Sequence, residues 1–317
     1  MVSASQVCSV CGEREAFFSR AYSGEKLCRK CFCDSIEAKV KATVSRYRML
    51  AFDDKVAVAV SGGKDSVAML HVLARLERKQ PNAKLVAVTV DEGIAGYRDE
   101  ALAIAAENAE KLGVPHSVVS FKELFGVTLD EIVARRKKIA SAGVTSCAVC
   151  GVLRRRALNL AARKLGADKL VTAHTLDDEV QTVLLNIFHG DVWRLAKEKP
   201  FTDFVHEKFV RRIKPFCEVP ERESALYALV RGVRFQSCRC PYASEALRND
   251  VRGMLNRLEE KHAGIKFTIF SSIERIRPAL ELTAKEEGLG ECRDCGEPST
   301  MRVCRTCQLL KEFGKVQ

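Results

Sequence analysis

The chain has 317 residues and a formal net charge of +11, and 47% of its residues are hydrophobic while 29% are charged. This composition is typical of a soluble globular protein with room for one full α/β domain and small appendages. Because no apolar run approaches the ~20 residues of a membrane span and the N-terminus lacks a signal-peptide core, we expect a cytoplasmic protein without membrane segments.

The positive charge gathers in clusters at 135–138, 154–156 and 211–212. Such clusters favour a polyanionic partner, and nucleic acid is the commonest one. Only 7% of the residues are aromatic, so a folded RNA contacted through its shape and phosphates agrees better than stacked single-stranded bases. Ordinary solvated basic faces are the alternative interpretation.

Cysteine spacing predicts a metal site near the N-terminus. The chain has 14 cysteines, which in a cytosolic protein indicate metal binding rather than disulfides. Two Cys-x-x-Cys pairs predict a four-cysteine zinc ribbon over residues 1–33, with Cys8, Cys11, Cys28 and Cys31 as ligands. We expect Cys33 to be a packed thiol and a linking helix to follow over 34–53, opening at residue 34.

A strand, a glycine turn and a helix N-terminus come next. The small apolar run 56–60 predicts a central strand, and a helix is expected over 66–79. The turn between them consists of Ser61, Gly62, Gly63, Lys64, Asp65 and Ser66. Glycines let the backbone approach a ligand and the helix dipole favours negative charge, so the turn is a candidate phosphate site. The hexapeptide lacks the Walker A pattern and resembles the PP-loop of the N-type ATP pyrophosphatases, which cleave ATP to AMP and pyrophosphate.

Strands and helices then alternate. We expect strands at 56–60, 85–90, 116–121, 169–173 and 212–216, and helices at 66–79, 98–112, 130–140, 151–165 and 177–189. This order predicts an α/β fold over 54–217, with a doubly wound, mostly parallel sheet and a ligand crevice at the carboxyl ends of its strands. His174 is the histidine expected in the crevice. Asp177 is a candidate for holding Mg²⁺ or the nucleotide, and Asp91 for similar work or for the ribose.

A third cysteine pair, Cys147 and Cys150, lies just before the helix expected from residue 151. The next cysteines along the chain are Cys217, Cys238 and Cys240. A pair and one distant cysteine are one ligand short of a closed zinc site, and three interpretations stay open. They are a [4Fe–4S] cluster with one open iron, a persulfide resolved by Cys240, and a structural zinc with a non-cysteine fourth ligand.

The C-terminal segment has the same kind of cysteine spacing as the N-terminal one. Two Cys-x-x-Cys pairs predict a second four-cysteine zinc ribbon over 281–317, with Cys292, Cys295, Cys304 and Cys307 as ligands. Both ribbons are expected to be closed and structural, because a small segment without its own core takes its folding free energy from the metal. A helical extension is expected over 218–280.

Five segments together resemble the tRNA 2-thiouridine synthetases, a PP-loop group that includes the TtuA-type enzymes and the archaeal and eukaryotic cytosolic wobble-uridine thiolation proteins. They are SGGKDS at 61–66, VDEGIAGYR at 90–98, CAVCGVLRR at 147–155, LDDE at 176–179 and CPYA at 240–243. The likeness covers essentially the whole chain. It implies a tRNA-uridine 2-sulfurtransferase: ATP adenylates the C2 oxygen of a uridine, sulfur displaces AMP, and diphosphate is released.

The resemblance also implies cofactors and partners. Sulfur would arrive as sulfide on the open iron of a [4Fe–4S] cluster held by Cys147, Cys150 and Cys240, delivered by the thiocarboxylated C-terminus of a ubiquitin-like carrier protein. The extension 218–280 would supply Cys240 and contacts to tRNA, and a homodimer is expected.

Individual roles are implied in the same way. Arg154 would neutralise charge on the α-phosphate of ATP, and Asp177 would act at the catalytic centre. The catalytic residues implied are Asp65, Cys147, Arg154, Asp177 and Cys240. ATP, bound with Mg²⁺, would be held by Ala59, Ser61, Gly62, Gly63, Lys64, Asp65, Ser66, Arg154 and Asp177.

Several questions stay open at the level of the sequence. The segments 151–155 and 186–191 favour the wobble uridine as target, whereas CPYA and LDDE favour the T-loop uridine, and we prefer the wobble position. Cys238 competes with Cys240 as third ligand, and the CPYA motif favours Cys240. Alternative functions are a tRNA 2-thiocytidine synthetase-like enzyme, an amidating or lysidine-type ligase, and a non-catalytic zinc-dependent RNA-binding protein.

Overall fold

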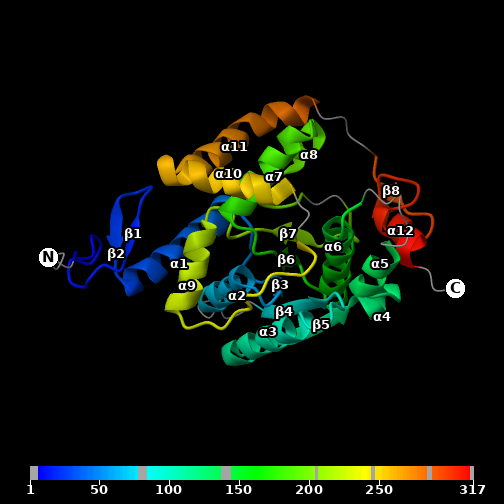
Figure 1. Cartoon of the computed structure of the whole chain (residues 1–317), viewed down its shortest axis with the longest axis horizontal. Coiled ribbons are helices and arrows are strands. Elements are labelled where there is room, and N and C mark those ends of the chain that lie inside the picture. The colour runs from blue at the N-terminus through cyan, green and yellow to red at the C-terminus, as the bar shows by residue number, and fades with distance from the viewer. Residues whose placement is uncertain are drawn as a thin grey trace.

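A five-stranded parallel sheet forms the centre of the molecule (Figure 1). The computed structural model describes residues 6–77, 84–136, 144–203, 206–243, 247–283 and 288–314. In spatial order the strands are β5 (His116–Ser120), β4 (Lys84–Asp91), β3 (Lys55–Ala59), β6 (Lys169–Val171) and β7 (Arg211–Ile213). All neighbouring strands run parallel. The α/β fold expected from the sequence is confirmed, and the strand that leads into the glycine turn is the central one.

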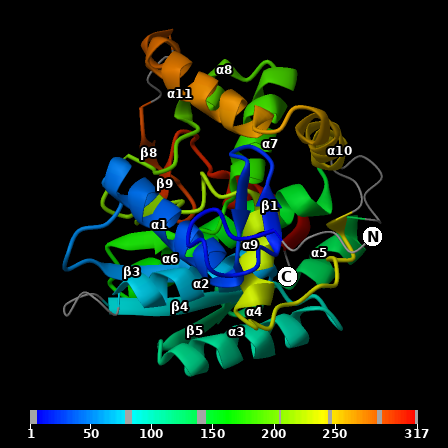
Figure 2. The same ribbon diagram turned by 90° about the vertical axis from the view of Figure 1, so that its left-hand side faces the viewer.

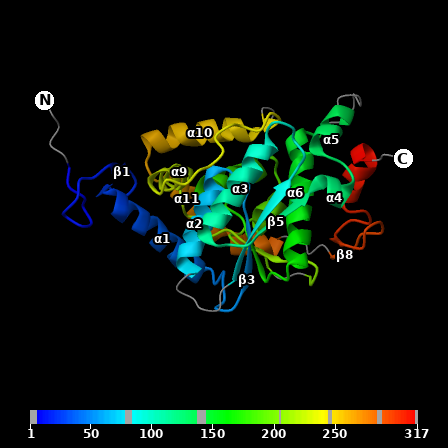
Figure 3. The same ribbon diagram turned by 90° about the horizontal axis from the view of Figure 1, so that it is seen from below.

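Helices cover both faces of this sheet, as Figure 3 shows. One face carries α1 (Arg29–Arg46), α2 (Lys64–Glu77), α3 (Arg98–Leu112) and α9 (Glu221–Val230), and the other carries α4 (Phe121–Phe125), α5 (Leu129–Arg136) and α6 (Ser146–Lys164). Consecutive residues of β3 serve opposite cores, since Val56 and Val58 belong to the first and Ala57 to the second. Burial on both faces explains why the strands are continuous apolar runs.

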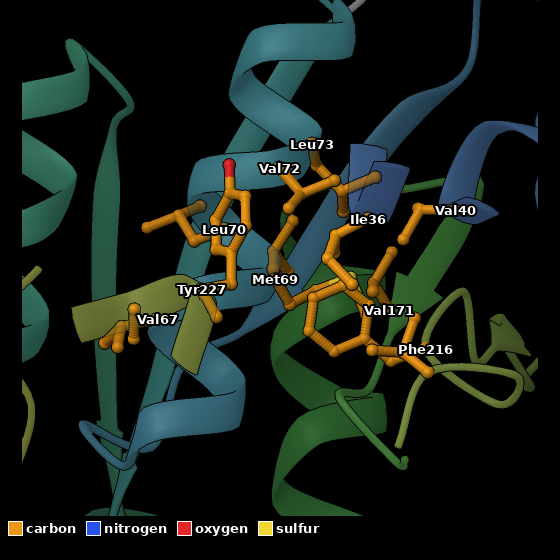
Figure 4. Close-up of a cluster of buried hydrophobic side chains, with 14 of the residues drawn as sticks. Ile36, Val40, Val67, Met69, Leu70, Val72, Leu73, Val171, Phe216 and Tyr227 are labelled. Carbon is orange, nitrogen blue, oxygen red and sulfur yellow. The ribbon is translucent and has the colours of Figure 1, made fainter. Parts of the chain in front are cut away.

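The larger core lies between the sheet and helices α1, α2 and α9 (Figure 4). Met69, Leu70 and Leu73 of α2 are fully buried there together with Ile36 of α1 and Tyr227 of α9. Burying one aliphatic side chain of this size contributes about 1.5–3 kcal/mol. The packing therefore fixes the helix that follows the glycine turn, and with it the direction of that helix's N-terminus.

Four more helices form a layer of their own, at the top of Figure 1: α7 (Leu176–Phe188), α8 (Val192–Lys197), α10 (Leu247–Lys261) and α11 (Ile265–Thr283). Both α10 and α11 pack on α7, and α8 packs on α7 and α11. The interval 218–280, expected to be helical, holds α9, α10 and most of α11. No helix in the described part of the chain is long and apolar enough to cross a membrane.

Small modules at the two termini lie at opposite ends of the long axis in Figure 1, and Figure 2 looks onto the N-terminal one. The N-terminal module pairs β1 (Phe18–Arg20) with β2 (Glu25–Leu27) before α1. The C-terminal module pairs β8 (Gly290–Glu291) with β9 (Pro298–Ser299) and ends in α12 (Arg305–Leu309) and the π-helix η2 (Leu310–Gly314).

Two helices, α1 and α6, begin more than one turn before the residue expected. The linking helix begins at Arg29 rather than at residue 34, because the Sγ of Cys28 accepts a hydrogen bond from the Cys31 amide and caps it. Helix α6 begins at Ser146 rather than near residue 151, because the Thr145 hydroxyl accepts from the Ala148 amide, at 3.2 Å. Residues 78–79 and 137–140 of the expected helices lie outside the described residues.

Candidate active site

The glycine turn after β3 requires glycine at its second position. Gly62 has φ +85°, a left-handed conformation that side chains disfavour. A Cβ atom on Gly62 would also lie 2.6 Å from the carbonyl oxygen of Ala101 in α3. The turn is therefore pressed against α3, and its other side, at the N-terminus of α2, faces the sheet's carboxyl-end pocket.

Hydrogen bonds hold the turn in shape from inside and outside. The Ser66 hydroxyl donates to the Gly63 carbonyl at 2.8 Å and accepts from the Ser61 amide at 3.0 Å. From outside, the Gln236 amide donates to the Gly62 carbonyl at 2.9 Å, and Gly63 and Gln236 form a parallel β-bridge. The turn is thus preorganised, with the amides of the first turn of α2 available to an anion.

A pocket of about 1140 Å³ opens beside this turn. It collects side chains from β3, β4, α6, α7, α8, β7, α10 and α12. Seven residues predicted from the sequence line it: Ala59, Ser61, Gly63, Asp65, Ser66, Cys147 and Arg154. Five others are near it but outside its lining: Gly62, Lys64, Cys150, Asp177 and Cys240. The crevice expected at the carboxyl ends of the strands therefore exists and joins the phosphate turn to the third cysteine group.

Lys64 and Asp177 belong to a chain of ion pairs behind the turn. Lys64 Nζ lies 2.7 Å from both Asp65 Oδ2 and Glu221 Oε1. The Glu221 amide donates to Asp177 Oδ2 at 2.7 Å, and Lys266 of α11 pairs with Asp177 Oδ1. Both carboxylate oxygens of Asp177 are therefore engaged, and its side chain is 6% exposed. The structure does not bring Asp177 into the pocket, because its carboxylate is bonded to α9 and α11.

The third cysteine group lies where α6 begins. Cys147 and Cys150 lie in the first turns of α6, and Cys147 Sγ lies 3.1 Å from the Tyr242 carbonyl oxygen in the CPYA segment. The Tyr242 hydroxyl donates to Asp130 Oδ1 at 2.6 Å, which fixes that segment against α5. Cys150 and Cys240 both pack against the second core. The fold therefore gathers cysteines that are 90 residues apart in the chain beside the phosphate pocket.

Arg154 lies one turn beyond Cys150 and is tied to the phosphate turn through two residues. Its Nη1 lies 3.6 Å from Glu92 Oε1, and Arg98 Nε lies 2.7 Å from Glu92 Oε2. Arg98 in turn donates to the Ser61 carbonyl at 3.1 Å. Glu92 and Arg98 are buried, so this relay is rigid.

Sequence reasoning chose Asp91 at this rim, whereas Glu92 lines the pocket. Asp91 instead accepts a hydrogen bond from the Gly93 amide at 2.8 Å and closes its own turn. Successive residues leaving a strand point to opposite sides, so the alternation along β4 was the signal that separates the two carboxylates.

Further polar residues complete the floor of the pocket. His174 lines it, as expected, and burial together with the charge of Lys214 lowers the pKa of His174 to about 3, so its ring is neutral at physiological pH. Lys214 Nζ lies 2.9 Å from Glu179 Oε2 and also pairs with Glu198. Burial raises the pKa of Glu179 to about 7, although Lys214 opposes the shift. Glu179, Glu198 and Lys214 were not singled out in the sequence.

The two terminal cysteine sets form compact clusters. In each set the four Sγ atoms lie within 4.8 Å of one another, and the clusters are Cys8, Cys11, Cys28 and Cys31, and Cys292, Cys295, Cys304 and Cys307. Across the described ranges, no other group of three or more potential ligands is as tight. The thiols of Cys147, Cys150 and Cys240 therefore stand farther apart than ligands of a single ion.

Comparison with known proteins agrees with this geometry. A family model described as a PP-loop domain matches residues 34–259. The chain is 38% identical to the tRNA 2-thiolation protein NcsA of Haloferax volcanii, over 98% of this chain and 99% of that protein. It is 36% identical to the cytoplasmic tRNA 2-thiolation protein 1 of Saccharomyces cerevisiae, over 99% of this chain and 88% of that protein.

A solved structure extends the likeness to three dimensions. It is the U34-tRNA thiolase NcsA from Methanococcus maripaludis with its [4Fe-4S] cluster, which matches with a TM-score of 0.84 and 34% identity, over 100% of this chain and 99% of that one. The family model agrees with the phosphate turn, and the relatives and the solved structure are all tRNA thiolation proteins. The chain belongs to the PP-loop tRNA 2-thiolation family.

Proposed function

We propose that this chain is an ATP-dependent sulfurtransferase that converts a tRNA uridine to 2-thiouridine, with release of AMP and diphosphate. The observation that carries the proposal is the shared pocket, whose lining includes the phosphate turn, Cys147 and Arg154. Activation of an oxygen by ATP and delivery of sulfur need both elements within reach of one nucleotide, and a single pocket satisfies that need.

ATP would bind with its phosphates on the turn. The amides at the start of α2 would bind phosphate oxygens, with Ala59 and Gly63 lining the approach and the hydroxyls of Ser61 and Ser66 beside them. Asp65 and the two hydroxyls form an oxygen-only donor set, which is the chemistry that Mg²⁺ prefers, so Asp65 would hold the metal. Lys64 and Asp177 would act as positioning residues, because Glu221 joins them behind the turn.

Arg154 would stabilise the transition state of adenylation. Its side chain is 49% exposed and lines the pocket, and its guanidinium is oriented by Glu92. A planar guanidinium suits the two oxygens of an α-phosphate, and removing one such donor typically costs about 10²–10³ in rate.

Cys147, Cys150 and Cys240 would hold a [4Fe–4S] cluster. Three thiolates bound to different irons stand farther apart than ligands of one ion, which agrees with their separation here. When bound, the cluster would supply an open iron for sulfur. The two compact cysteine quartets would each bind zinc, since four thiolates within 4.8 Å suit a closed tetrahedral site.

The proposal is tested with anaerobically purified protein, tRNA, ATP and sulfide, by measuring AMP, diphosphate and 2-thiouridine. We expect Arg154→Ala to lower the thiolation rate about 10²–10³-fold with iron content and tRNA affinity retained, and Arg154→Lys to recover part of the rate. The matched control is Arg222→Gln, an exposed arginine on α9 outside the pocket. Wild-type protein with full iron that forms neither AMP nor 2-thiouridine would overturn the proposal.

Metal analysis separates the cluster from a persulfide relay. We expect about four irons and two zincs per chain, with iron lost and zinc kept in Cys147→Ala/Cys150→Ala. Protein that makes 2-thiouridine without iron, even after anaerobic reconstitution, would instead assign the three cysteines to thiol exchange.

The wobble uridine is our proposed target. The support is the likeness to a U34-tRNA thiolase over the whole chain. Two tRNA transcripts test it, one with the wobble uridine replaced by cytidine and one with the T-loop uridine replaced. Loss of product with the first transcript alone is expected, and loss with the second alone would contradict the assignment.

We also propose a cytoplasmic homodimer that receives sulfur from a ubiquitin-like carrier protein. Three exposed apolar residues at the α7–α8 corner, Ile187, Phe188 and Val192, support an association surface. Light scattering of the purified protein tests the dimer, and thiolation with a thiocarboxylated carrier in place of sulfide tests the donor.

A further inference from the structure

The pocket continues past the phosphate turn into a basic end. Arginines from three separate elements line it there: Arg155 from α6, Arg194 from α8 and Arg212 from β7. The phosphate turn comes from other elements, at the junction of β3 and α2. Sites for one small ligand are typically about 300–1,000 Å³, so a pocket of about 1140 Å³ has room for ATP and for part of a second ligand.

Two of these arginines lack the carboxylate partner that a partly buried arginine usually has. In the described part of the chain, neither Arg155 nor Arg212 has a carboxylate within ion-pair distance. The carboxylate whose charge acts on Arg212, Glu198, is held by Lys214. The Nε of Arg212 is buried and has no hydrogen-bond partner among the described residues. A buried donor left unpaired costs free energy unless a ligand satisfies it.

The arginines also stand close enough to repel one another. Burial and the charge of Arg155 lower the pKa of Arg212 to about 10. Burial and the charges of Arg154 and Arg194 lower the pKa of Arg155 in the same way. An anion between the guanidiniums would relieve this repulsion, and the planar fork of arginine matches the two free oxygens of a phosphodiester.

We propose that Arg155, Arg194 and Arg212 form an arginine subsite that binds a phosphodiester of the RNA strand carrying the target nucleotide. The inference rests on the proposed function and deepens it, since Arg155 is the neighbour of Arg154 on α6 and a strand held there would present its base toward the phosphate turn. The chain's net charge of +11 favours a polyanion over the single carboxylate of a protein tail.

The test is the salt dependence of tRNA affinity in holoprotein. We expect Arg155→Gln/Arg212→Gln to weaken tRNA binding about tenfold and to reduce the slope of log K against log salt by about one. ATP affinity, iron and zinc content are expected to stay at wild-type values. Arg222→Gln, which removes an exposed charge outside the pocket, should leave the slope unchanged, and Arg155→Lys/Arg212→Lys should restore most of it.

The outcomes separate this inference from the proposed function. A wild-type slope in the glutamine variant, with the wild-type protein thiolating normally, would overturn the subsite alone. A second outcome is that the glutamine variant binds tRNA as the wild type does but loses sulfur transfer only when a carrier protein supplies the sulfur. This outcome would mean that the arginines bind a peptide carboxylate, and it would overturn the RNA assignment. Wild-type protein without 2-thiouridine activity would overturn the function, while the altered slope would still support the subsite.

Discussion

The two terminal cysteine modules look alike in the sequence and differ in where the fold puts them. The N-terminal module docks on α9, where Arg20 pairs with the buried Glu223 at 3.0 Å. The C-terminal module docks on α6, where Arg156 and Arg163 pair with the buried Glu297 at 2.7 and 2.6 Å. Only the C-terminal module contributes described residues to the pocket, namely Met301, Arg305 and Gln308.

The difference teaches that the role of a cysteine cluster follows from the helix on which its module rests. Helix α6 carries Cys147, Cys150 and Arg154, so the C-terminal module supports the chemistry directly. Helix α9 packs behind the phosphate turn, where its Glu221 pairs with Lys64. The C-terminal four-cysteine module is thus expected to be part of the active site, whereas the N-terminal one is expected to stabilise the fold only.

Removing each metal site in turn is the strongest way to break this comparison. Metal binding supplies about 10–16 kcal/mol to such modules, so Cys295→Ser/Cys307→Ser should unfold the C-terminal one. We expect the thiolation rate to fall about 100-fold or more, because a pocket wall and the support of α6 are lost. Cys11→Ser/Cys31→Ser should lower thermal stability but leave the rate of the remaining folded protein within a few-fold of wild type. Equal rate losses would contradict the distinction.

Removing the glutamate at each docking contact tests the same comparison between the two modules more finely. Glu223→Ala removes one of the two carboxylates that Arg20 contacts and leaves it Glu25 of its own module, which should lower the free energy of unfolding by about 2 kcal/mol in denaturant titrations, with the KM for tRNA unchanged. Glu297→Ala removes the partner of Arg156 and Arg163, which are more exposed than Arg20. It should therefore lower the free energy of unfolding by less than Glu223→Ala does, but it should raise the KM for tRNA. A KM effect confined to Glu223→Ala would reverse the assignment of the two modules.

The smallest expected effect concerns one charge on each module. Arg305→Gln removes a pocket-lining charge of the C-terminal module and should raise the KM for tRNA about threefold, which corresponds to roughly 0.7 kcal/mol. Arg29→Gln, on the N-terminal side, removes an arginine that lies over the ring of Phe17 and should leave that KM unchanged. Steady-state kinetics over a range of tRNA concentrations measures both.

Much of this architecture was accessible from the sequence because its signals are local. Each expected strand overlaps an observed one, since two-sided burial requires continuous apolar runs such as 56–60. The phosphate turn and both cysteine quartets follow from short fixed spacings. The predicted starts of α1 and α6 were wrong, because Cys28 was interpreted as a metal ligand only and the capping hydroxyl of Thr145 was not considered.

The rest of the site depends on contacts between distant segments. The sequence contains no sign that Lys266 engages Asp177, 89 positions away, or that Glu92 rather than Asp91 aims Arg154. Arg155 and Arg212 were given no individual role in the sequence, because the meeting of α6 and β7 is a property of the fold. Such pairings are decided by tertiary packing, which no local pattern encodes.

One short segment, finally, joins the proposed sites of two ligands. Gln236 bridges the phosphate turn at Gly63, and the third cysteine, Cys240, follows four residues later on the same backbone. Ligands that share a rigid segment are thermodynamically linked, and the linkage is reciprocal: whatever factor the cluster applies to ATP affinity, ATP applies to cluster affinity. Because oxygen destroys [4Fe–4S] clusters, a nucleotide that tightens cluster binding would also slow cluster loss. Protein saturated with ATP should therefore keep its iron longer in air than nucleotide-free protein.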